Sequence, residues 1–143
     1  MRNKGQAAME YMTMIGLSLL ILMGLLVVVH FMTTAANDQI KMNTAHDAVN
    51  KLAEAADFVY IHGHPTKITV YVDIPENIIN DPANTYISGK TINLGTSISG
   101  EVNDIYAVTK GNVEGTLPAT KGYYVFIVKS TGEDIADNIS ITY

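Results

Sequence analysis

The chain has 143 residues, of which 48% are hydrophobic and 16% are charged, and its formal net charge is −5. This length suits one domain and a long helix but not two large domains, and the acidic balance argues against binding to nucleic-acid phosphates. Because the chain contains no cysteine, it has no disulfide framework and no thiolate metal site. The fold must therefore be stabilised by burial.

An apolar segment lies near the start of the chain. Residues 12–32 carry no acidic or basic side chain except His30. As a helix of about 1.5 Å per residue this segment measures roughly 32 Å, close to the ~30 Å hydrocarbon core of a bilayer. It exceeds the apolar region of a cleaved secretory signal, which has about 7 to 15 residues. Arg2 and Lys4 precede it, so the positive-inside rule predicts a cytoplasmic N-terminus and an exported remainder.

Glu10 precedes this segment and is not explained by a simple membrane anchor. A carboxylate at the bilayer boundary or within a helix bundle is costly unless a cation pairs with it. The alternative is a solvated residue in the first helical turn, where a negative charge suits the helix dipole. The sequence Lys4-Gly5-Gln6-Ala7-Ala8-Met9-Glu10-Tyr11 resembles the class III signal peptide of archaeal type IV pilins, although its basic leader is shorter than is usual in that family.

This resemblance implies a processing site and an assembly site. A prepilin peptidase would cut between Gly5 and Gln6, remove residues 1–5 as a leader and leave the apolar segment in place. Glu10 would then be the fifth residue and would pair with the N-terminal amine of Gln6 on a neighbouring subunit. A freshly cut amine is a cation of the right sign for a buried carboxylate. The filament-core face of the helix would include Tyr11, Ile15, Leu19, Leu22, Leu26 and Val29.

The helical pattern continues beyond residue 32. Apolar residues recur every three or four positions, while most polar residues occupy other positions, which predicts one buried face. The members of that face are Ala45, Val49, Leu52, Ala56 and Val59. Gly63 and Pro65 mark the helix end. We expect one helix over residues 6–62, with bending favoured at Gly16, Gly24 and residues 33–39.

Residues 63–143 are expected to form a β-rich head domain. In residues 67–74 and 139–143 the apolar positions alternate, as in half-buried strands. Residues 123–129 are apolar on both faces and suit the middle of a sheet. Weaker strands are expected at 85–88, 91–94 and 104–109, with a hairpin turn at Ser88-Gly89-Lys90. The prediction is an α+β fold, in which an antiparallel sheet or sandwich packs on the second half of the helix.

The remaining polar motifs are interpreted without special chemistry. His62-Gly63-His64 is read as a helix end rather than a metal site, and Glu133-Asp134 as part of a solvated loop. We identify no catalytic motif, and the sequence calls for no metal and no cofactor. Asn138-Ile139-Ser140 is an N-glycosylation sequon, and Asn138 is a candidate site if the head is exported.

These features favour a homo-oligomeric structural protein, the pilin subunit of an archaeal adhesion pilus. Its partners would be other copies, the membrane before assembly, the prepilin peptidase, an assembly ATPase and a membrane platform protein. It would begin as a membrane-inserted precursor and end in an extracellular filament. The alternatives are a single-pass anchored binding domain, an archaellin-like motility subunit and a secreted enzyme. The archaellin reading is disfavoured because the Gln6, Glu10 and Tyr11 arrangement is not typical of archaellins.

Overall fold

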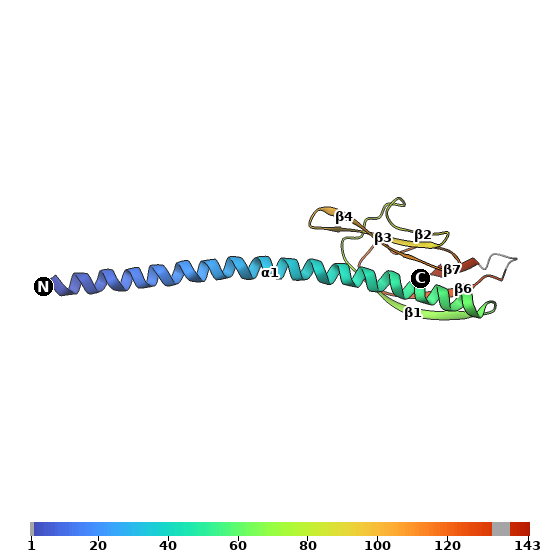
Figure 1. The fold of residues 1–143 in the computed structure, drawn as a ribbon, viewed down its shortest axis with the longest axis horizontal. Coiled ribbons are helices and arrows are strands. Elements are labelled where there is room, and N and C mark those ends of the chain that lie inside the picture. Colours follow the sequence, from blue (N-terminus) through green and yellow to red (C-terminus); the bar gives the residue numbers. More distant parts are fainter. Residues whose placement is uncertain (1, 133–137) are drawn as a thin grey trace. The chain divides into compact units, whose positions relative to one another are not determined.

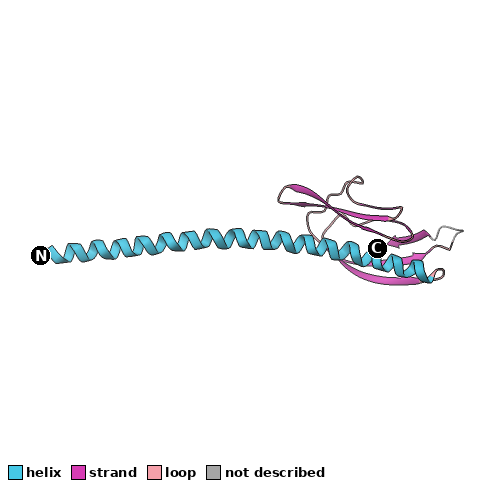
Figure 2. Cartoon of the chain, viewed as in Figure 1, coloured by secondary structure: helices cyan, strands magenta, loops and turns pink. Residues whose placement is uncertain are grey.

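The computed structural model describes residues 2–132 and 138–143, with side chains from Gly5 onward. Within these residues, one helix, α1 (Arg2–His62), is followed by seven strands, and Figure 2 distinguishes the two kinds of element by colour. The strands are β1 (Lys67–Ile74), β2 (Tyr86–Ser88), β3 (Thr91–Ile98), β4 (Glu101–Val108), β5 (Asn112–Gly115), β6 (Gly122–Ser130) and β7 (Asn138–Thr142). The predicted α+β fold is confirmed.

The chain divides into two compact units after Asn37. The first unit contains the apolar part of α1. The second unit, Asp38–Tyr143, contains the rest of α1 and every described strand. The helix is uninterrupted at Gly16, Gly24 and residues 33–39, where the sequence favoured bending. The second half of the helix therefore belongs to the head.

The strands form a single sheet in the order β1-β6-β7-β5-β2-β3-β4. Its pairings are antiparallel except that β5 and β7 run parallel, with Val113 opposite Ile139. The sheet is therefore mixed rather than wholly antiparallel. The difference arises from β5, which the sequence did not predict because its four residues are too few for an alternating pattern. β6 lies inside the sheet as expected, but one of its faces exposes Tyr123 and Val125.

The core lies between the sheet and the second half of α1, and Figure 1 shows the strands beside this part of the helix. The predicted face of α1 is fully buried, with Leu52 and Val59 at 0% exposure. Several small residues share that face, which lets the helix approach the strands closely: Ala45, Ala48, Ala53, Ala55 and Ala56. From the sheet, Phe126 is the largest side chain that is fully buried. Burial of this apolar surface stabilises the head.

Helix α1 ends at the predicted position. Gly63 adopts a left-handed conformation with φ of 66°, and its amide donates to the carbonyl of Val59 at 2.9 Å. Glycine takes this backbone shape without the steric cost that a Cβ brings. The His62 ring stacks on Phe58, with ring centroids 4.0 Å apart, and its Nδ1 lies 2.8 Å from the Phe58 carbonyl. These are the contacts of a helix terminus.

Candidate functional site

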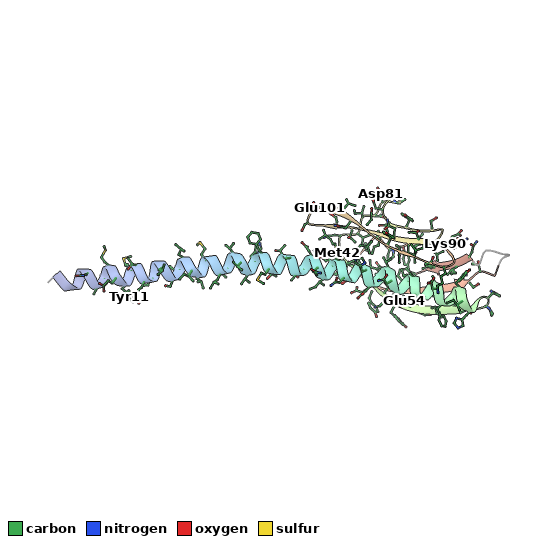
Figure 3. All side chains as sticks on the ribbon, viewed as in Figure 1. Tyr11, Met42, Glu54, Asp81, Lys90 and Glu101 are labelled. Carbon is green, nitrogen blue, oxygen red and sulfur yellow. The ribbon has the colours of Figure 1, made fainter. Side chains whose placement is uncertain are left out.

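The most distinctive surface of the molecule is the apolar first part of α1. Its large apolar side chains from Met9 to Met32 are 43–74% exposed. Figure 3 shows side chains projecting both above and below the helix around and beyond Tyr11. Soluble monomers rarely expose a contiguous apolar patch larger than roughly 600 Å². We define this surface, residues 9–32, as the assembly helix.

The hydroxyl side chains of this region donate to main-chain carbonyls of the same helix. Thr13 donates to the Glu10 carbonyl at 2.8 Å and Ser18 to the Met14 carbonyl at 2.8 Å. Thr33 and Thr34 make the same type of bond one turn back, at 2.9 and 3.1 Å. A hydroxyl bonded in this way needs no water and is compatible with hydrocarbon. By length and composition α1 could cross a membrane.

The residues of the expected processing and pairing sites lie in one stretch of α1. Gly5, Gln6 and Glu10 are all exposed, and a Cβ added at Gly5 would meet no atom within 4 Å. Gln6 and Glu10 are four positions apart, so they face the same side of the helix one turn apart. The described part of the chain therefore leaves residues 5–10 accessible.

The residues expected on the filament-core face are also exposed. Their exposed fractions are 68% for Tyr11, 43% for Ile15, 59% for Leu19, 53% for Leu22, 62% for Leu26 and 57% for Val29. Their spacing of three or four residues places them along one side of the helix. Residues on other sides, such as Met12 and Leu20, are as exposed, at 74% and 70%. The geometry therefore makes the whole circumference available for packing.

Polar contacts join the second half of α1 to the residues that flank β4. The sequence did not predict these contacts. Ser99, in the turn between β3 and β4, donates to Asp38 Oδ2 at 2.6 Å. The Lys110 amide donates to Asp57 Oδ1 at 2.7 Å. The two residues of each hydrogen bond lie 61 and 53 positions apart in the sequence. No local sequence pattern could therefore have predicted either bond. They align β4 with α1, because Ser99 precedes the strand and Lys110 follows it.

An ion-pair cluster holds the same helix to the end of β1. Lys41 Nζ lies 2.9 Å from Glu76 Oε1, and Lys121 Nζ lies 3.5 Å from Glu76 Oε2. The hydrogen bond from Lys41 lowers the pKa of Glu76, and the nearby charge of Lys121 lowers it further. The same hydrogen bond raises the pKa of Lys41. Exposed pairs of this kind contribute modestly and position elements more than they stabilise them.

The candidate glycosylation residue, Asn138, is half-buried at the start of β7. Its main-chain carbonyl accepts bonds from the amide and hydroxyl of Thr131, at 3.0 and 2.7 Å. The neighbouring Ile139 and Ile141 are buried, so alternation along the strand places the Asn138 side chain on the outer face of the sheet. Glu133-Asp134, interpreted above as part of a loop, lies outside the described residues.

The chain was compared with protein-family models, curated proteins and solved structures, and none of these comparisons finds a match. The candidate site is therefore judged on its own chemistry. It offers a long apolar surface with internally bonded hydroxyls, one carboxylate at its N-terminal end and a separate compact head. Such a surface can be covered by lipid or by other apolar helices.

Proposed function

We propose that the protein is a pilin, the structural subunit of an archaeal type IV adhesion pilus. The observation that carries this proposal is the apolar first unit of α1, exposed on every side and joined to a head that completes its own core. The Gly5-Gln6 junction and Glu10 at the start of that helix add support from the sequence. The proposed role is structural and uses no catalytic residue and no cofactor.

The proposed mechanism starts with a precursor that spans the membrane with its N-terminus in the cytoplasm. The prepilin peptidase cuts between Gly5 and Gln6 and removes Arg2 and Lys4, which hold that end in the cytoplasm. The assembly helices then exchange lipid for one another, while the heads cover the outside of the filament. Because lipid is as apolar as leucine, packing and polar pairing decide specificity. An assembly ATPase and its platform protein supply the work.

Glu10 has a defined role in this mechanism. A carboxylate transferred into a helix bundle needs a cation, and the new amine of Gln6 on a neighbouring copy provides one. The pairing fixes the axial position of each subunit relative to the next. A subunit that lacks its partner leaves a charge buried and unpaired, which opposes incorporation.

The test is N-terminal mass spectrometry of filaments sheared from cells that express the chain. A subunit that begins at Gln6 in those filaments is the expected result. Finding only uncut protein, extracted with detergent from membranes, would overturn the proposal. The control is Gly5→Val, which should block the cut and keep the chain in the membrane fraction.

A second candidate is a single-pass anchored surface domain that never polymerises. The internally bonded hydroxyls of Thr13, Ser18, Thr33 and Thr34 suit a permanent membrane span equally well. That candidate predicts monomers in detergent and no sheared filaments. The same fractionation therefore separates the two functions.

A further inference from the structure

Among the described strands of the head, β1 and β4 are the outermost in the sheet order and form its two edges. Each contains eight residues and, within the described chain, pairs along one side only. Edge strands present main-chain amides and carbonyls that can pair with another strand, and proteins commonly block them with proline, lysine or a bulge. Neither strand contains proline or glycine, and lysine occurs only at the first position of β1.

Both edge strands run alongside the second half of α1, but in opposite directions. β1 begins just after the end of the helix and leads to Glu76, which pairs with Lys41. β4 begins after Ser99, which contacts Asp38, and leads to Lys110, which contacts Asp57. Relative to α1, therefore, β1 runs backward and β4 runs forward. Figure 1 shows both strands beside this part of the helix.

We propose that β4 of one copy pairs with β1 of the next copy, so that the sheet continues from head to head along the filament. The inference rests on the proposed function, in which all copies point their helices the same way. Side by side, two such copies present β4 and β1 to each other in antiparallel directions. When β4 of one copy pairs with β1 of the next, each growing row of heads keeps an unpaired β1 at one end and an unpaired β4 at the other. Further copies can therefore be added without closing the row.

The side-chain pattern fits this pairing. Full antiparallel overlap places Thr69 opposite Tyr106 on the outer face and Val70 opposite Ile105 on the face that packs on α1. The outer face of β4 exposes Val102, Tyr106 and Val108, at 59%, 66% and 65%. Aromatic and β-branched residues opposite each other stabilise strand pairs. This register continues the apolar inner face of one head into that of the next and keeps the outer faces on the same side.

The charges at the ends of the strands predict a salt dependence. Full overlap places Lys67 diagonally near Lys110, and Asp73 diagonally near Asp104 on the outer face, so like charges approach each other toward both ends of the overlap. These side chains are exposed, and salt screens repulsion between exposed charges over a Debye length of about 10 Å at 0.1 M. Contact between the edges should therefore strengthen as the salt concentration rises.

The test uses the absence of cysteine in the chain. Tyr106→Cys is combined with Thr69→Cys for full overlap, and with Lys67→Cys or Tyr71→Cys for a slip of two residues in either direction. Opposed residues of antiparallel strands have Cα atoms about 4.5 to 5.5 Å apart, which a disulfide can bridge. Mild oxidation of filaments should give a ladder of covalent oligomers for one register, with a yield that increases with salt.

The single variants Thr69→Cys and Tyr106→Cys are the matched controls and should stay monomeric. Dimers from Tyr106→Cys alone would show a two-fold contact between β4 strands and would overturn the proposal. Intact filaments in which none of the three double variants gives a ladder would overturn it as well, while the proposed function stands. If the unmodified chain forms no filaments, both proposals fail.

A second measurement needs no substitution. Amides of edge strands exchange slowly with solvent only if they are hydrogen-bonded. Hydrogen exchange in peptides covering 67–74 and 101–108 should be slower in filaments than in detergent-solubilised monomers, by at least about tenfold. A peptide covering the exposed loop at 80–83 is the control and should not change. Equal exchange of the edge peptides in both states would refute the pairing.

Discussion

At the scale of single residues, Glu10 and Glu76 are two carboxylates with different tasks. Glu76 has its partners within the chain, in Lys41 and Lys121. Glu10 lies exposed at the start of an apolar helix, and its proposed partner is the amine of another copy. On the proposed function, Glu76→Gln should change the stability of the head, whereas Glu10→Gln should change assembly.

Glu10→Gln should preserve folding and processing but reduce the yield of sheared filaments by about tenfold or more. Removing one partner of a buried ion pair costs about 3 to 5 kcal/mol, and each 1.4 kcal/mol is a factor of ten. Filament mass per cell and N-terminal sequencing measure the two effects. Glu54→Gln, on an exposed face of the same helix within the head, is the control. A normal yield from Glu10→Gln would remove the role assigned to this residue.

The Glu76 cluster predicts how stability depends on pH. The pKa of Glu76 is lowered in the folded state, so its contribution is present above the unfolded pKa of about 4.3 and is lost as the pH falls through the lower, folded pKa. The pKa of Lys41 is raised, so its contribution is present below its unfolded pKa of about 10.4 and is lost at higher pH, as the folded value is passed. Between these limits both contributions persist.

Glu76→Gln should therefore lower the unfolding midpoint at pH 7 by a small amount and leave it nearly unchanged at pH 2. Thermal unfolding of the full chain in detergent, followed by circular dichroism from pH 2 to 7, measures this. Lys41→Met should give a similar loss, and the double variant should lose less than the sum, because the pair is coupled. A loss that is equal at pH 2 and pH 7 would contradict the assignment.

At the scale of elements, α1 is one helix with two different surroundings. Its first unit has no buried face, while its second unit buries one face against the sheet. Small residues dominate that buried face, with Leu52 as its largest member. Truncation of Leu52 should therefore test the packing of helix on sheet directly.

Leu52→Ala is expected to destabilise the head by about 2 to 5 kcal/mol, because it removes a fully buried side chain and leaves a cavity. Urea unfolding of the full chain in detergent measures the change, and the slope with urea should stay the same. Lys51→Ala, the adjacent exposed position, should change stability by less than about 0.5 kcal/mol. Equal effects of the two variants would show that this face does not support the sheet.

At the scale of the whole molecule, the buried core of the described residues lies in one unit, and the exposed apolar stretch of the helix lies in the other. Every buried apolar residue of the described core lies beyond Asp38, so the head has no need of the first unit. The apolar side chains of residues 9–32, in contrast, are not buried by the described residues of the chain. The proposed function requires such a division, in which the head folds in one environment and the helix transfers from lipid into a filament.

A fragment of residues 38–143 should accordingly fold as a soluble monomer that does not form filaments. Dispersed amide signals in NMR spectra and a monomeric mass in sedimentation are the expected results. The shorter fragment 63–143 should not fold, because it lacks the half of the core that α1 provides. A well-folded 63–143 would show that the sheet is stable without the helix.

Elements with strong local sequence patterns could be predicted before the structure was known. Residues 12–32 are apolar all round, and the buried face of α1 repeats every three or four residues up to Gly63, so length and periodicity predicted the helix and its end. Alternation predicted β1 in full and β7 to within one residue at each end, and a run that is apolar on both faces predicted β6. These patterns are local, because they depend on which residues of a single segment are buried and which are exposed.

Other features became apparent only in the folded chain: the order of the strands, the short β5 with its parallel partner, and the contacts of Asp38, Asp57 and Glu76. Each depends on residues distant in sequence, and an exposed carboxylate has the same local pattern whether it is paired or solvated. Among the described strands, β1 and β4 form the two edges of the sheet. The sequence of a single strand does not indicate whether that strand lies at an edge. Pairing between distant segments is decided by the collective packing of the sheet against α1.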